Sequence, residues 1–293
     1  MAGGTGPLSD ATALVNLVGH LSGDNTFENR DQVSKKMENF SGVIYSMPPF
    51  RDLSHAYEDF QPYFNLYATV RKDIPCSSLH ILTNTGHSNK WVFDNDYLCG
   101  LQKYGPVDDM TEKIADIIKK EYKEGENVLI LGTIAADNAN LYANLLQARN
   151  VSYKLPRGNE TDGTDAPNYL QCIIDRAKEG KITENMPGEE RTCGQAFVDF
   201  CVAHTNITNS NSLLFSCTEI PMLLHTKIPG HDTKTYLDQL AESLPPDKSF
   251  KFYDSEELFV QIMAEKNQHL QSNPSLRSSI LKEEPHKTIT IDM

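Results

Sequence analysis

The sequence predicts an α/β fold, in which parallel strands alternate with helices. Short apolar runs typical of buried strands are followed by longer segments with helical spacing of apolar residues, along most of the 293 residues. The clearest strand is 127–131, and the clearest amphipathic helix is 110–122. The alternation on either side of residue 107 predicts two lobes, each with a mostly parallel sheet flanked by helices.

The first half of the chain has the less regular pattern. A glycine-rich loop at residues 2–7 precedes a helical pattern over 10–21, and such a loop can hold an anion with its backbone N–H groups. Residues 42–46 and 79–82 have the composition of strands, and each run ends in a loop. We therefore expect the sheet of this half to be built from these runs.

The second half predicts a regular succession of strands and helices. Its expected strands are 127–131, 151–155, 212–215 and 250–253, and its expected helices are 110–122, 136–149, 169–179, 188–204, 236–243 and 255–266. The expected division is an N-terminal lobe of 1–107 and 248–267, a C-terminal lobe of 108–224, an insertion of 225–247 outside the shared core, and a flexible tail of 268–293. The tail is expected to be flexible because its Ser, Asn, Pro and Glu content can bury little apolar surface.

Composition excludes several classes of function. The formal net charge is 27 − 40 = −13, which argues against a nucleic-acid partner. No apolar run approaches the roughly 20 residues of a membrane span, and the N-terminus has no signal-peptide pattern. The six cysteines lack paired metal-ligand spacing, so we expect no metal site and reduced thiols in the cytoplasm.

Two strand-to-loop junctions have the same form and together predict a site. The run 79–82 leads into Thr83, and the run 212–215 leads into Ser216 and Cys217. Open α/β sheets bind ligands at the carboxyl ends of their strands. We therefore expect Thr83 and Cys217 to face each other across the interface between the lobes, with room for a small ligand.

Four short motifs, taken in order, resemble a known family. They are Gly3-Gly4-Thr5-Gly6-Pro7, Thr83-Asn84-Thr85-Gly86-His87, Gly132-Thr133 and Ser216-Cys217-Thr218-Glu219. In order and approximate spacing they resemble the signatures of the cofactor-independent aspartate/glutamate racemases, over roughly residues 2–267.

The resemblance implies two similar α/β lobes with the active site in the cleft between them and no cofactor. In that family one cysteine removes the α-proton of the amino acid, and a second cysteine returns a proton to the opposite face. Cys217 matches one of the two, and Thr83 stands where the other is expected, as in the subset of the family associated with L-aspartate and L-glutamate. The implied protein is a cytoplasmic isomerase acting on a small acidic amino acid, with a homodimer as a candidate assembly.

The resemblance also implies substrate-binding residues. They are Thr5, Arg51, Asn84, Thr85, Thr133 and Thr218. Arg51 matches an arginine that holds the distal carboxylate in aspartate-specific members, whereas Pro167 falls where those members have a lysine. The strand that precedes Gly-Gly in the family has no counterpart before Gly3.

Each candidate residue also has an ordinary structural interpretation. Cys217 could be a buried thiol without chemistry, and Asn84, Thr85 and Thr218 could cap helices or turns. His87 is expected to orient the site loop, and Glu219 is interpreted as structural. Two other functions stay open: an isomerase or lyase in which Cys217 attacks a small diacid, and a racemase-like fold that binds a ligand without turnover.

Overall fold

The computed structural model describes residues 110–156, 165–246 and 249–272, together with Thr69 and the pairs 79–80 and 107–108. The strands are β1 (Leu79–His80), β2 (Val107–Asp108), β3 (Val128–Leu131), β4 (Tyr153–Lys154), β5 (Ser212–Phe215) and β6 (Lys251–Asp254). The helices are α6 (Met110–Glu121), α7 (Ile134–Asn138), α8 (Leu141–Ala148), α9 (Ala166–Lys178), α10 (Cys193–Thr208), α11 (Glu219–His225), α12 (Tyr236–Ser243) and α13 (Ser255–Ser272).

A four-stranded parallel sheet forms the centre of the described structure and confirms the α/β prediction. The strand order is β4-β3-β5-β6, and every pair is parallel. Leu131 at the end of β3 lies beside Phe215 at the end of β5, which in turn lies beside Asp254 of β6. The loops that follow these three strands therefore leave the sheet at the same edge. The other described pair, β1 and β2, forms a separate parallel sheet.

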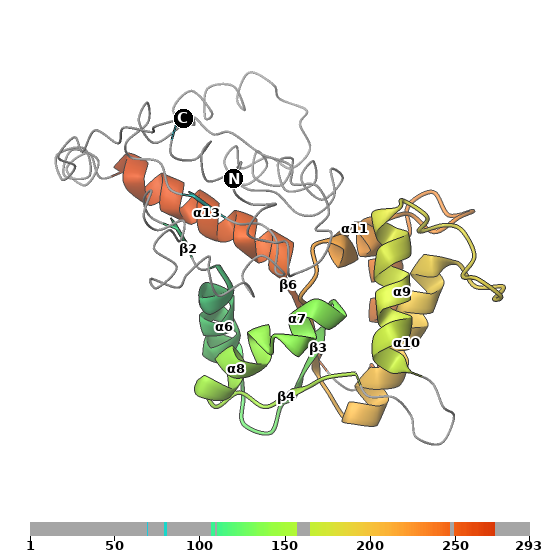
Figure 1. Cartoon of the computed structure of the whole chain (residues 1–293), viewed down its shortest axis with the longest axis horizontal. Helices are drawn as coiled ribbons and strands as arrows, with labels where there is room; N and C mark the ends of the chain where they lie inside the picture. Colours follow the sequence, from blue (N-terminus) through green and yellow to red (C-terminus); the bar gives the residue numbers. More distant parts are fainter. Residues whose placement is uncertain are drawn as a thin grey trace, which may run out of the picture.

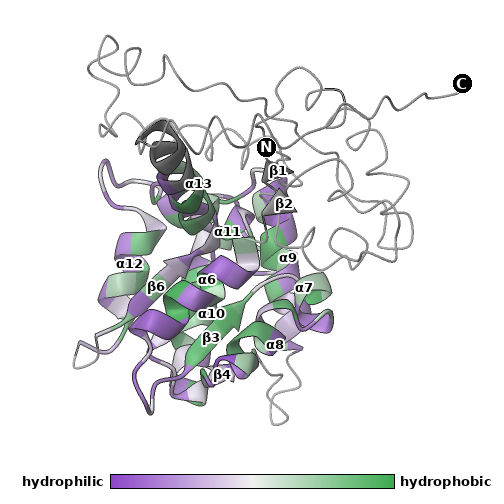
Figure 2. Ribbon diagram, turned by 90° about the vertical axis from the view of Figure 1, so that its left-hand side faces the viewer, coloured by the Kyte–Doolittle hydropathy of each residue, from purple (hydrophilic) through white to green (hydrophobic). Residues whose placement is uncertain are grey.

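Helices cover both faces of the four-stranded sheet. Leu129, Leu131, Leu213 and Phe215 pack against helices α9 to α12, whereas Val128, Ile130 and Leu214 pack against α6, α8 and α13. This alternation follows from the two-residue period of a strand. The two groups of helices lie on opposite sides of β3 in Figure 1, and β3 is hydrophobic along its length in Figure 2, as burial on both faces requires.

The helix expected at 136–149 is two helices. Helix α7 ends at Asn138, and Asn140 has a left-handed backbone with φ of 51° before α8 begins. Asparagine tolerates this conformation better than most residues, so it allows the chain to turn between the two helices. The break leaves α7 as a short helix beside the end of β3.

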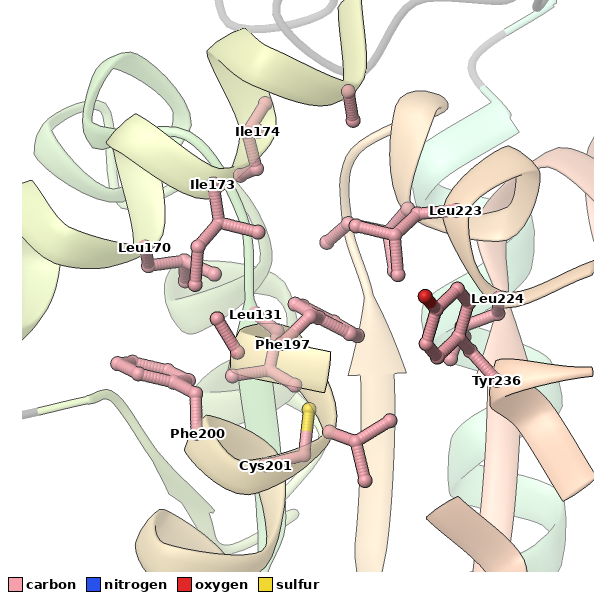
Figure 3. Close-up of a cluster of buried hydrophobic side chains, with 14 of the residues drawn as sticks. Leu131, Leu170, Ile173, Ile174, Phe197, Phe200, Cys201, Leu223, Leu224 and Tyr236 are labelled. Atoms are coloured by element: carbon pink, nitrogen blue, oxygen red, sulfur yellow. The ribbon is translucent and has the colours of Figure 1, made fainter. Parts of the chain in front are cut away.

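The segment 225–247 was wrongly expected to lie outside the shared core. Tyr236 and Leu240 of α12 are buried in the same cluster as Phe197 and Leu223. Figure 3 shows the Tyr236 side chain among this cluster. The Tyr236 ring lies against Gly194 of α10, where a Cβ atom would come within 2.3 Å of the ring. Helix α12 therefore docks on α10 because the facing position carries no side chain.

Residues 251–265 also differ from the expected division. Strand β6 pairs with β5, and α13 packs against α6 through a cluster that includes Phe259, Val260 and Met263. The expectation that 248–267 belongs with residues 1–107 is therefore wrong for β6 and for the described side chains of α13. The physical reason is that β6 completes the parallel sheet beside β5, and the apolar face of α13 covers that sheet. The other lobe boundaries remain predictions.

Candidate active site at the ends of strands β3 and β5

The candidate site lies where β3 and β5 end side by side. The backbone N–H of Ser216 donates to Leu131 O at 2.8 Å, and its hydroxyl donates to the same oxygen at 3.0 Å. A Cβ atom at Gly132 would lie 2.3 Å from the Ser216 hydroxyl oxygen. Glycine at this position therefore lets the two strand ends approach, and this contact fixes where the next residue, Cys217, is placed.

Cys217 is buried and paired with a carboxylate. Cys217 is 4% exposed, and its Sγ donates a hydrogen bond to Oε2 of Glu219 at 2.9 Å. The hydroxyl of Thr218 donates to the same oxygen at 3.3 Å. Glu219 is itself 3% exposed, so the thiol and the carboxylate share an environment from which water is largely excluded.

This environment disfavours the thiolate. Burial raises the pKa of the Cys217 thiol well above its ordinary value, and the negative charge of Glu219 raises that pKa further. Lys178 acts in the opposite direction. In the described surroundings of the thiol, desolvation and a like charge therefore outweigh the single nearby cation.

Lys178 supplies the positive charge beside the pair. It is the last residue of α9, a helix that packs against α11, and its ammonium lies 3.4 Å from Asp175 Oδ1. Burial acts to lower the pKa of this ammonium, but the neighbouring acidic groups Cys217, Glu219 and Asp175 outweigh burial and raise it. Lys178 is therefore held in its charged form within electrostatic range of the thiol and the carboxylate.

Thr133 lies at the end of β3, where its hydroxyl caps a helix. The backbone N–H of Ala136 donates to Thr133 Oγ1 at 3.3 Å, and Thr133 is 8% exposed. The next backbone N–H, of Ile134, donates to Oε1 of Gln171 at 3.0 Å. In the described structure these polar groups stabilise the start of α7, and a role for Thr133 in substrate binding stays a prediction.

A small pocket lies beside Ser216 and is lined by residues of β3, α7 and α8. Its internal volume is about 10 Å³, which is room for about one water molecule. Asp137 of α7 lines it, and burial raises the pKa of this carboxyl to about 6. The carboxylate of Asp137 thus lacks the surroundings that would favour its charged form.

The structure brings part of the expected site together. Cys217, Thr218 and Thr133 all follow strand ends at one edge of the sheet. The remaining candidates lie outside the described residues, so their placement is untested: Thr5, Arg51, Thr83, Asn84, Thr85 and His87. Within the described part of the chain, no group of three or more His, Cys, Asp or Glu side chains could hold a metal ion, and no helix there is long and apolar enough to cross a membrane.

Two residues of the site were missed or undervalued in the sequence. Glu219 was interpreted as structural, although an acid two positions after a cysteine at a strand-to-helix junction is a usable signal. Lys178 had no such signal, because it comes from α9, far from Cys217 in the chain. The packing of α9 against α11 places the ammonium within electrostatic range of the thiol.

Comparison with solved structures shows what this architecture is similar to. A Picrophilus torridus aspartate racemase superposes with a TM-score of 0.54 and 17% identity, over 91% of this chain and 94% of that one. An aspartate racemase homologue from Pyrococcus horikoshii gives 0.54 and 16% identity, over 91% and 97%. A glutamate racemase from Bacillus anthracis gives 0.51 and 15% identity, over 93% and 81%. The chain has the fold of the aspartate and glutamate racemases.

The racemase fold was expected from the four motifs, and the structural comparison confirms it at the level of the fold. The sequence itself matches no family model and no curated protein. Identities of 15–17% are too low to carry residue roles across, so the possible chemistry follows only from the side chains of this chain.

Proposed function

We propose that the protein is a cofactor-independent racemase of aspartate or glutamate. Cys217 removes the α-proton from one face of the amino acid, and Thr83 returns a proton to the other face. The observation that carries the proposal is the buried thiol of Cys217 at the carboxyl end of a central strand, in contact with a carboxylate at 2.9 Å. The racemase fold supports it.

The chemistry requires a strong base in a site that excludes water. Removing a proton from carbon next to a carboxylate is difficult because the carbon acid is very weak, and hydrogen bonds to the carboxylate stabilise the charge that develops there. A thiol whose pKa is raised forms a more basic thiolate, and this reduces the difference in pKa between the thiol and the α-carbon of the substrate. In this proposal Thr218 and Thr133 contribute to carboxylate binding in the C-terminal half.

The rest of the site is assigned to the N-terminal half. Thr5, Asn84 and Thr85 are proposed to bind the α-carboxylate and the amino group, and Arg51 the distal carboxylate. A hydroxyl is a weaker acid–base group than a thiol at neutral pH, so Thr83 makes the return step the slower one. The two half-reactions are therefore unequal.

The test is exchange of the α-hydrogen in heavy water. We expect one enantiomer of aspartate or glutamate to lose its α-hydrogen signal by NMR faster than it racemises by chiral chromatography. Cys217→Ser reduces the exchange rate by at least about 10²-fold, since a serine hydroxyl is a far weaker base. Cys172→Ser, at an exposed thiol on α9, is the matched control and keeps the exchange rate.

The second variant, Thr83→Cys, tests the opposite face. It raises the racemisation rate because a thiol transfers protons more readily than a hydroxyl. If neither the wild type nor Thr83→Cys exchanges the α-hydrogen of D- or L-aspartate or of D- or L-glutamate, the racemase proposal is contradicted.

A racemase-fold binding protein without turnover is the second candidate. The observation in its favour is the raised pKa of Cys217, which keeps the thiol protonated at neutral pH. The same protonation also weighs against an isomerase or lyase in which Cys217 attacks a diacid, because the thiolate is the nucleophile. Calorimetric binding of an acidic amino acid without α-hydrogen exchange identifies the binding protein.

A further inference from the structure

The contact between Cys217 and Glu219 raises a question that the proposed reaction leaves open. The thiol must lose its proton before it can accept one from carbon, yet its surroundings raise its pKa well above neutral. A base with a protonated resting state needs a nearby acceptor for that proton. Glu219 Oε2, 2.9 Å from Sγ, is in position to accept it directly.

The charges around the pair favour one shared proton. With a proton on either the thiol or the carboxylate, the pair has one negative charge, which the Lys178 ammonium balances. Without that proton the pair has two negative charges in a buried site, which is strongly unfavourable. Asp175, which contacts Lys178, has a side chain 54% exposed, so solvent screens its charge.

Other elements around the pair bring no competing acceptor among the residues that the structure describes. The charged groups that act on the thiol are Glu219 and Lys178. Asp254, at the end of the neighbouring strand, accepts instead from the backbone N–H groups of Glu256 and Glu257, at 2.9 and 3.0 Å. Helix α12 contributes the buried Tyr236 and Leu240 to the core on this side.

We infer that Glu219 is the positioning residue that takes the proton of Cys217 when the thiol acts as a base. The Lys178 ammonium balances the single negative charge that the pair of Cys217 and Glu219 keeps throughout. The inference deepens the proposed racemase function, and its catalytic part rests on that function. Lys178 and Glu219 act through Cys217.

The proton transfers balance. The S–H bond of Cys217 breaks as an O–H bond forms on Glu219, then the substrate Cα–H bond breaks as a new S–H bond forms. The C–H electron pair stays with the substrate, delocalised into its α-carboxylate, until Thr83 supplies a proton to the opposite face. Water then carries the proton of Glu219 to the Thr83 oxygen, which restores the starting state. In the reverse direction Cys217 donates its proton to carbon and recovers one from Glu219.

The first experiment titrates the thiol without any substrate. The Cβ carbon shift of Cys217, assigned by its loss in Cys217→Ser, is followed by NMR against pH. Glu219→Gln lowers the thiol pKa by about one unit or more, because the like charge is removed. Lys178→Met raises it by about one unit, and Lys178→Arg leaves it within a few tenths. An unchanged titration in both Glu219→Gln and Lys178→Met overturns the shared proton.

The second experiment follows α-hydrogen exchange against pH. In Glu219→Gln the α-hydrogen exchange rate at neutral pH falls by about 10²-fold. The acid limb of the rate–pH profile moves to higher pH, where it follows the pKa of the Cys217 thiol without its carboxylate partner. Glu219→Asp, which keeps a carboxylate, restores part of the rate and of the original limb. If Glu219 only supports the fold, the rate falls equally at every pH, and that result overturns the inference.

The two experiments separate the two proposals. If the wild type shows no exchange, the racemase function fails while the titration still decides whether Cys217 and Glu219 share a proton. If exchange occurs and the titration is insensitive to both residues, the racemase function stands and this inference fails. If circular dichroism shows that Glu219→Gln does not fold, Lys178→Met alone provides the test, by whether it raises the pKa of the Cys217 thiol.

Discussion

Two neighbouring junctions of the same sheet use similar residues in opposite ways. Strand β3 leads through Gly132 and Thr133 into α7, and strand β5 leads through Ser216, Cys217 and Thr218 into α11. In both, a threonine stands at the N-cap position. Thr133 accepts the N–H of Ala136, as an N-cap residue commonly does, whereas Thr218 makes no side-chain cap and donates to Glu219 instead.

The difference indicates which junction has been shaped by something other than local stability. An N-cap hydrogen bond stabilises a protein by about 1 kcal/mol, and α11 does without it. Its threonine, thiol and carboxylate hydrogen-bond to one another instead. Departures from a local rule without compensation nearby are expected at functional sites.

The carboxylates at the two junctions differ in the same sense. Asp137 follows β3 and borders a pocket that holds about one water, and burial alone raises its pKa to about 6. Glu219 follows β5 and accepts hydrogen bonds from two side chains, with Lys178 nearby. The charged Asp137 carboxylate therefore destabilises the fold at neutral pH. The Glu219 carboxylate is instead part of a hydrogen-bonded cluster.

The largest expected effect comes from separating the two junctions. Gly132→Ala places a Cβ 2.3 Å from the Ser216 hydroxyl, and we expect it to lower the free energy of unfolding by about 3 kcal/mol. Urea denaturation followed by circular dichroism measures the loss.

Ser216→Ala gives the matched background. Removing the hydroxyl leaves the new Cβ with contacts of 3.5 Å, which are ordinary. In that background Gly132→Ala therefore lowers the free energy of unfolding by less than about 1 kcal/mol, and the double-mutant cycle shows strong coupling. Additive losses show that the strand ends are not held by this contact.

The sequence predicted the parts of this arrangement that depend on local pattern. The buried strands 127–131 and 212–215 and the position of Cys217 at a strand end follow from apolar runs bounded by polar turns, and the structure confirms them. Two features depended on packing between distant segments and could not be read locally. They are the docking of Tyr236 into the space at Gly194 and the approach of Lys178 to Cys217.

The next effect concerns the carboxylate at the β3 junction. Because burial raises the pKa of Asp137, the folded protein binds its proton more tightly than the unfolded chain does. Its contribution to stability is full below about pH 4 and is lost as pH rises through about 6. Asp137→Asn should thus raise the free energy of unfolding at pH 7 by about 2 kcal/mol, a value reduced for partial solvent contact.

The measurement is urea denaturation of both proteins from pH 4 to pH 7 at constant salt. The difference should be near zero at the acid end and grow with pH. Glu124→Gln, at an exposed carboxylate of the α6–β3 loop, is the control and should show no such trend. A difference that is constant with pH means that Asp137 is not the titrating group.

The smallest effect tests the threonines themselves. Thr133→Val and Thr218→Val each keep the shape of the side chain and remove the hydroxyl, so packing changes little at either position. Thr133→Val should lower the free energy of unfolding by about 1 kcal/mol because α7 loses its cap. Thr218→Val should lower it by about half as much, because Glu219 keeps the thiol of Cys217 as a hydrogen-bond donor. The thiol titration of Cys217 should respond to Thr218→Val and not to Thr133→Val, since only the former changes the hydrogen bonds of Glu219. If both variants lose the same stability and neither moves the titration, the two junctions are equivalent supports, and the departure at α11 has no chemical meaning.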